Sequence, residues 1–308
     1  MLNLSEDIAK MLRELTGKAD YSDGAFNVRA DGQSIGRQST GDIRIESKKD
    51  GTGLDIFIAP GTKRDKVHIP VVITKSGQKE VVYNDFHIGE GANVTIVAGC
   101  GIHNCGGLDS QHDGIHRFWL AKNSSVKYVE KHFGSGDGKG RRILNPGTEV
   151  YMEEGSSMEM EMVQIRGVDD TVRSTVAELA SNAKLVVRER LMTHNGQRAI
   201  STYVVRMNGA GASADVVSRS VARDDSYQKF DAKLVGNAPC NGHTECDSII
   251  MDNGRILAVP GLEANNVDAS LVHEAAIGKI AGEQLIKLMT LGLTEQEAEE
   301  QIINGFLK

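Results

Sequence analysis

The four cysteines of the chain fall into two pairs, and each pair encloses a histidine. The first pair is Cys100 and Cys105 in GCGIHNCGG, and the second is Cys240 and Cys246 in PCNGHTECD. Thiolate and imidazole groups suit soft metals and iron–sulfur centres. Neither pair, however, has the two-residue spacing of a zinc knuckle or a ferredoxin loop. Each cysteine alone is therefore as typical of a small buried hydrophobe as of a ligand.

The residues around Cys246 favour a ligand at that position, because acidic rather than apolar residues, Glu245 and Asp247, flank it. His243 lies three positions upstream and is a further candidate ligand. The dipeptide of His273 and Glu274 is a weaker signal. An acidic residue in the first turn of a helix, where the helix dipole stabilises it, explains Glu274 as well as metal binding does.

Two further patterns are poor candidates for a site. His112 and His116 are four residues apart and could form a metal pair on a helix, but the Asp-Gly between them predicts a turn. The glycine-rich segment 134–142 resembles a phosphate-binding loop, yet Lys139 is followed by Gly140 instead of Ser or Thr. We therefore expect no nucleotide to bind this chain. No Ser–His–Asp arrangement or nucleophile elbow is legible.

Composition narrows the class of protein. The chain has 308 residues, of which 40% are hydrophobic, so it can bury a core. The net charge of −7 argues against nucleic acid or an anionic membrane as the main partner. No apolar run is long enough for a membrane span, and the N-terminus lacks the apolar core of a signal peptide. We expect a cytoplasmic protein whose cysteines stay reduced.

The elements that must position these residues are mostly short strands. Four segments share one form, in which an apolar residue, a variable turn and a small residue precede a strand: IGEGANV from Ile88, LAKNSSV from Leu120, MEEGSSM from Met152 and LASNAKL from Leu179. Such a turn-plus-strand repeat with no intervening helix is typical of a β-solenoid. A β-sandwich with similar hairpins is the alternative.

Helices are expected only at the two ends. Leu4, Ile8, Leu12 and Leu15 have helical spacing and Gly17 stops the helix. At the other end, Ile277, Ile280, Leu285 and Leu288 form an apolar stripe that breaks at Gly292, and Thr294 with Glu297 forms a capping box for a helix that runs to Phe306. We therefore divide the chain into an N-terminal helical segment (1–40), a β core (41–270) and a C-terminal helical region (271–308).

Residues 242–306 resemble the C-terminal core of SufB and SufD, the scaffold proteins of the SUF iron–sulfur assembly pathway. The resemblance depends on ECDSII, HEAAIGKI, EQL and a last helix ending in GF, in that order and at family-like intervals. A looser likeness extends back to about Val81. The first sixty residues carry none.

The resemblance implies a mainly β fold, a right-handed parallel β-helix with a helical C-terminal region. It also implies a non-enzymatic scaffold that holds a transient iron–sulfur cluster for recipient apoproteins, while a SufC-type ABC ATPase docks on the helical region. In SufB the matching cysteine and glutamate, and in SufD the matching histidine, are the proposed cluster ligands. These positions are Cys246, Glu274 and His273 here. Cys240, His243, Cys100 and Cys105 remain further candidates.

The chain departs from the family pattern in two respects. It is shorter than a typical SufB, and it carries the cysteine, the glutamate and the histidine together. We therefore expect a homodimer in which one protein replaces the SufB and SufD pair. The competing interpretations are a β-helix enzyme, such as a lyase or an acyltransferase, and a simple iron-binding protein.

Overall fold

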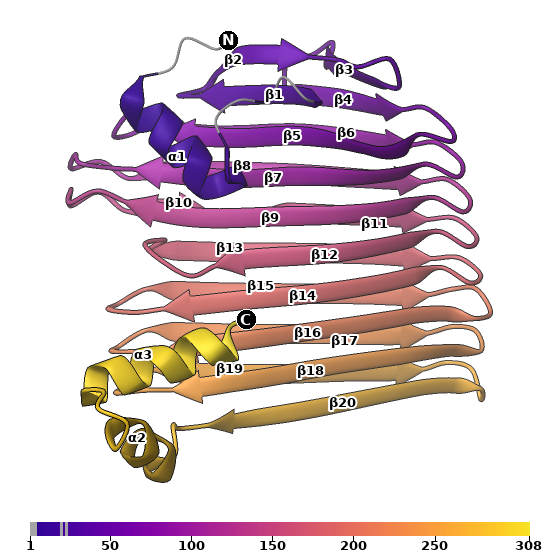
Figure 1. Ribbon diagram of the computed structural model, residues 1–308. Helices are drawn as coiled ribbons and strands as arrows, with labels where there is room; N and C mark the ends of the chain where they lie inside the picture. Colours follow the sequence, from indigo (N-terminus) through magenta and orange to yellow (C-terminus); the bar gives the residue numbers. More distant parts are fainter. Residues whose placement is uncertain (1–4, 19–20, 22–23) are drawn as a thin grey trace.

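The computed structural model describes residues 5–18, 21 and 24–308, and it is a β-solenoid of about eight turns (Figure 1). Each turn gives one strand to each of two sheets, and the strands within a sheet are parallel over most of its length. This confirms the predicted parallel β-helix and excludes the β-sandwich.

The strands of sheet A, in spatial order, are β2 (Gln33–Gln38), β1 (Ala25–Ala30), β5 (Lys63–Ile73), β7 (Asn93–His103), β9 (Ser125–Ser135), β12 (Ser157–Gln164), β14 (Lys184–Thr193), β16 (Ala212–Ala222), β18 (Cys240–Ile250) and β20 (Ala269–Gly278). The strands of sheet B, in spatial order, are β19 (Arg255–Ala264), β17 (Tyr227–Gly236), β15 (Arg198–Met207), β13 (Asp170–Leu179), β10 (Arg142–Leu144), β8 (Ser110–Leu120), β6 (Lys79–Ile88), β4 (Gly53–Ile58) and β3 (Ile43–Ser47), with β11 (Gly147–Met152) pairing β8 and β13.

The four predicted repeats are the corners at which the chain passes from sheet B to sheet A. The fourth residue of each repeat has a positive φ: Gly91 (62°), Asn123 (56°), Gly155 (68°) and Asn182 (57°). Glycine and asparagine tolerate this left-handed conformation best, which explains their choice here. The backbone N–H of each of these residues donates to the next corner, as in the 3.0 Å bond from Gly91 to the carbonyl of Lys122.

The three helices lie at the two ends of the chain: α1 (Glu6–Thr16), α2 (Gly282–Met289) and α3 (Glu295–Phe306). Helix α1 ends at Gly17 in a left-handed conformation, as predicted. The capping box of Thr294 and Glu297 is present, and α3 ends at Phe306 as expected. Leu4, the first residue of the predicted N-terminal stripe, lies outside the described residues.

Two of the predicted helical segments, 1–40 and 271–308, contain strands as well as helices. The segment 1–40 is not helical throughout, because β1 and β2 form a hairpin around Asp31 and Gly32, both with positive φ. An Asp-Gly pair is a common signal for such a turn. At the other end, the helix begins at Gly282 rather than at 271. Strand β20 fills the gap because it pairs residue by residue with β18 as far as Gly278, and this pairing outweighs the helical spacing that begins at Ile277.

Candidate functional site

Cys246 points into the interior of the solenoid. Side chains on β18 alternate, so that Cys240, Thr244, Cys246 and Ser248 are buried while His243, Glu245 and Asp247 face outward. Cys246 is 1% exposed and belongs to the main hydrophobic core, although its sequence neighbours Glu245 and Asp247 are acidic. They lie on the other face of the same strand. Burial raises the pKa of the Cys246 thiol.

His273 shares this interior with Cys246. On β20, His273 pairs with Thr244 and Ala275 pairs with Cys246, so His273 and Cys246 are diagonal neighbours on one face. The Nδ1 atom of His273 is buried and has no hydrogen-bond partner among the described residues. A buried polar atom without a partner is costly. A ligand that binds the lone pair of this nitrogen, such as a metal ion, would remove that cost.

Glu274 lies on the opposite face of sheet A from Cys246. It follows His273 on the strand and pairs with Glu245 in the register, and Glu245 faces outward. Within one chain, the structure therefore brings Cys246 and His273 together and separates Glu274 from both. The prediction from the sequence placed His273 and Glu274 on a helix, where this separation was not visible.

The C-terminal end of the solenoid is open. Strands β19 and β20 are the last of their sheets, and no further turn covers them (Figure 1). Leu262 and Ile277 have inward registers, opposite the buried Leu234 and Ser248, yet they are 43% and 42% exposed. Cys246 thus lies one turn inside an exposed apolar mouth.

A buried polar network extends from this region toward the middle of the solenoid. Glu189 accepts hydrogen bonds from the hydroxyls of Ser201 (2.5 Å), Tyr203 (2.9 Å) and Ser218 (2.7 Å). The Nε atom of Arg173 lies 3.7 Å from Glu189, and its Nη1 atom donates to Glu130. Ser218 is the register partner of Cys246 on the neighbouring strand. The network therefore comes within one strand of the thiol.

The same network reaches the N-terminal half. Tyr128 donates to Glu130 at 2.9 Å, and its hydroxyl lies 2.7 Å from Nδ1 of His116. Burial opposes ionisation of Glu130, but Arg173 and the neighbouring histidines outweigh it and hold the pKa of Glu130 well below its ordinary range. Burial also lowers the pKa of His116 and His132 to about 4.

Sequence reasoning missed this network, although strand alternation contains the signal. Ala177 and Leu179 set the inward positions of β13, and counting back by two places Arg173 inside. The same alternation corrects the prediction for His112 and His116. Both lie on strand β8 rather than in a turn, and both are buried.

The first cysteine pair is remote from Cys246. Cys100 is buried on β7, which four strands of sheet A separate from β18, or about 24 Å at the usual strand spacing. Cys105 is exposed, with its Sγ atom 3.1 Å from Nε2 of His103. The structure therefore does not bring the two predicted cysteine pairs together.

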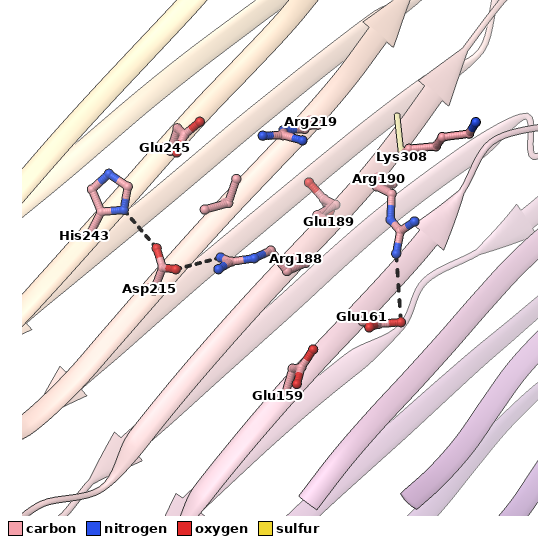
Figure 2. Close-up of a pocket in the computed structure, with 11 residues that line it drawn as sticks. Glu159, Glu161, Arg188, Glu189, Arg190, Asp215, Arg219, His243, Glu245 and Lys308 are labelled. Atoms are coloured by element: carbon pink, nitrogen blue, oxygen red, sulfur yellow. Dashed lines mark hydrogen bonds and ion pairs between the residues drawn. The ribbon is translucent and has the colours of Figure 1, made fainter. Parts of the chain in front are cut away.

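The outer face of sheet A carries a second cluster of candidate ligands. His243, Glu245 and Glu274 each offer a ligand atom, and these atoms lie within 4.8 Å of one another. Figure 2 shows the groove that contains His243 and Glu245, with Asp215 beside the histidine. The carboxylate of Asp215 accepts from Nδ1 of His243 at 2.8 Å and from Arg188 at 2.7 Å. A hydrogen bond with Asp247, together with burial, raises the pKa of Glu245.

No helix in the described part of the chain has the length and apolarity that a membrane crossing requires.

The known proteins that this chain resembles are described as iron–sulfur cluster assembly proteins. The sequence pattern described as "SUF system FeS cluster assembly, SufBD core domain" matches residues 72–306. An iron-sulfur cluster assembly SufBD family protein of Archaeoglobus fulgidus is 30% identical over 278 residues, covering 86% of this chain and 70% of its own. A second, from Methanocaldococcus jannaschii, is 26% identical over 255 residues, covering 82% and 79%. The iron-sulfur cluster assembly protein SufB of Bacillus subtilis is 34% identical over 100 residues, covering 31% and 22%.

Proposed function

Because the chain belongs to the SufBD family of iron–sulfur cluster assembly proteins, we propose that it is a non-enzymatic scaffold that holds a nascent cluster and passes it to recipient apoproteins in the cytoplasm. The match spans most of the solenoid and its C-terminal helices. A lyase, an acyltransferase or a simple iron store has no comparable support.

The observation that supports this proposal is that Cys246 and His273 are diagonal neighbours on the inner face of sheet A at the open end. The inner face there offers one thiol and one imidazole whose Nδ1 atom lacks a partner among the described residues. Both ligand types bind iron in iron–sulfur proteins. A site with fewer than four thiolates fits a cluster that must be released again, because its ligands exchange more readily.

Cys246 and His273 of one chain leave the coordination of a cluster incomplete. Among the described residues, Cys246 belongs to no group of three ligand atoms that lie within 4.8 Å of one another. A second copy docked through the open end would supply its own Cys246 and His273 across a two-fold axis. The exposed edges of β19 and β20 favour this homodimer, since uncovered parallel edges need a partner. In this arrangement Glu274 stays outside the shared site.

We place the SufC-type ATPase on helix α2. None of the residues of α2 is buried, and Ile286 and Met289 are 62% and 42% exposed. Leu291, just beyond the helix, is 77% exposed. Apolar side chains at helical spacing on a solvent-facing helix are typical of a surface that docks into a groove.

The ATPase site can be tested by charge insertion. Ile286→Asp should abolish capture of the SufC-type ATPase in a pull-down, because it puts a charge in the centre of the apolar surface. The matched control is Val81→Asp, which alters another exposed apolar residue (50% against 62% for Ile286) on β6, at the other end of the solenoid from α2. Retained capture by Ile286→Asp, or loss in both variants, would move the docking surface elsewhere.

The scaffold function itself is tested by anaerobic reconstitution. The protein, incubated with ferrous iron and sulfide, should develop the visible absorption of an iron–sulfur cluster and then lose it to an added apoferredoxin. Iron binding without sulfide uptake would indicate a simple iron store. Turnover of a polysaccharide, or absence of the chromophore, would contradict the proposal.

A further inference from the structure

We propose that His243, Glu245 and Glu274 form a divalent-cation site on the outer face of sheet A, separate from Cys246, and that its natural ion is ferrous iron. The choice of iron rests on the proposed function, whereas the site itself does not. Strand β18 thus presents a thiol for the cluster on its inner face and a cation site on its outer face.

The strand register brings the three side chains together. His243 and Glu245 are two residues apart on β18, so they share the outer face. Glu274 on β20 is the register partner of Glu245. Their ligand atoms lie within 4.8 Å of one another, so small side-chain movements would place all three around one ion.

Asp215 orients the histidine for metal binding. Its carboxylate accepts the hydrogen bond from Nδ1 of His243 at 2.8 Å, so the proton sits on Nδ1 and the lone pair on Nε2. In Figure 2 this second ring nitrogen lies on the side of Glu245, away from Asp215. A carboxylate behind a ligating histidine is the usual outer partner in metal sites. Arg188 in turn fixes Asp215 at 2.7 Å.

The charges around the site favour a cation. Among the described residues, no lysine or arginine forms an ion pair with Glu245 or Glu274 within 4.0 Å, and Asp247 adds a third carboxylate next to Glu245. Arg219 lines the same groove, but its charge acts on the pKa of Glu245 more weakly than Asp247 does. The guanidinium of Arg188 donates a hydrogen bond to Asp215, so Asp215 balances its charge. A divalent ion would offset the repulsion that now acts between the carboxylates.

The ligand types define the ion class. One imidazole nitrogen and two carboxylate oxygens suit first-row divalent ions such as Fe²⁺, Mn²⁺, Co²⁺ and Zn²⁺ better than ions that prefer thiolate alone. Three protein ligands leave open positions for water. His243 is about one third exposed and Glu274 is exposed, so an ion could enter and leave without unfolding.

Cobalt titration of the full chain, free of iron and cluster, tests the proposal. Co²⁺ reports its ligands by its visible d–d bands and, where a thiolate binds, by near-ultraviolet charge transfer. We expect one Co²⁺ per chain by equilibrium dialysis, with d–d bands and no thiolate charge transfer. His243→Ala and Glu245→Gln should each weaken binding at least tenfold, and Asp215→Asn by about 10- to 100-fold.

The matched control is Glu161→Gln, which removes a carboxylate from the same groove on β12 and should leave Co²⁺ affinity unchanged. Cys246→Ser separates this site from the cluster site, because it should retain Co²⁺ binding while the cluster chromophore is lost. The proposal is overturned if His243→Ala binds Co²⁺ as the parent protein does, if Cys246→Ser abolishes binding, or if no Co²⁺ binds. A missing chromophore with intact Co²⁺ binding would instead count against the proposed function alone.

Discussion

The two ends of the solenoid are finished in different ways. At the N-terminal end the chain covers its own edges, because β2 pairs antiparallel with β1 and β3 pairs antiparallel with β4. Helix α1 packs against β5, β7 and β9 of sheet A, with Met11, Leu12 and Leu15 buried. At the C-terminal end the helices turn away along the outer face and leave β19 and β20 uncovered (Figure 1). An edge that a protein leaves unprotected is an edge prepared for a partner.

The interior chemistry follows the same division. In the N-terminal and middle turns the buried charges are paired, as in the contact of Arg173 with Glu130. Near the open end the interior holds the Cys246 thiol, 3.6 Å from the hydroxyl of Ser248, and the Nδ1 atom of His273, which has no partner among the described residues. The earlier turns also hold unpartnered polar atoms, such as Oγ1 of Thr148 and Thr175, but these are neutral hydroxyls rather than soft metal ligands. Satisfied buried groups fix the fold, whereas unsatisfied groups are available to a ligand.

The largest expected effect comes from breaking the closed network. Arg173→Leu leaves the carboxylates of Glu130 and Glu189 buried without their cation, which should reduce the free energy of unfolding by about 3–5 kcal/mol. Urea denaturation measures this. Arg188→Leu is the matched control on the outer face, where loss of a partly exposed pair costs about 0–1 kcal/mol. Equal destabilisation by the two substitutions would contradict the distinction between interior and surface.

A smaller effect is expected from placing a charge at the open end. Leu262→Lys adds an ammonium group to the exposed apolar mouth and should weaken self-association at least tenfold, measured by sedimentation velocity. Ile35→Lys on β2 is the control, because Ile35 is also partly exposed and lies on the edge strand at the other end. A protein that is monomeric before substitution, or that dissociates equally with Ile35→Lys, would place the interface elsewhere or exclude it.

A third expected effect, gradual per pH unit, is a pH dependence of stability that belongs to the closed half. In the folded protein the pKa of His116 and His132 is about 4, whereas in the unfolded chain it is near 6.5. Between these values the unfolded chain binds more protons, so the protein should lose stability as the pH falls from about 6.5 toward 4. The loss is up to about 1.4 kcal/mol per pH unit for each histidine.

His132→Gln should flatten this dependence by about 1 kcal/mol per pH unit, measured by chemical denaturation at several pH values. His87→Gln is the control, because His87 is not fully buried and stacks on Phe57 and Trp119 on the outer side of sheet B. An unchanged slope in His132→Gln would show that other groups cause the acid sensitivity.

The sequence predicts the turns of this fold better than its ends. The four corner repeats are legible because only residues such as Gly91 and Asn123 accept the required backbone conformation. Strand alternation could also have placed Arg173 inside. The face of Glu274 could not be predicted, because it depends on β20 continuing the sheet where local spacing favours a helix. The juxtaposition of Asp215, His243 and Glu274 could not be predicted either, since they lie on three successive turns that must stack in register to bring them together.

The most direct test of the account compares one cysteine from each half. Iron and sulfide bound per chain are measured after anaerobic reconstitution of Cys246→Ser and Cys100→Ser. Both cysteines are buried, so burial alone does not distinguish them. The account predicts that Cys246→Ser loses the cluster while Cys100→Ser retains it, with both variants folded by circular dichroism. Retention of the cluster by Cys246→Ser, or its loss only in Cys100→Ser, would contradict a cluster site at the open end.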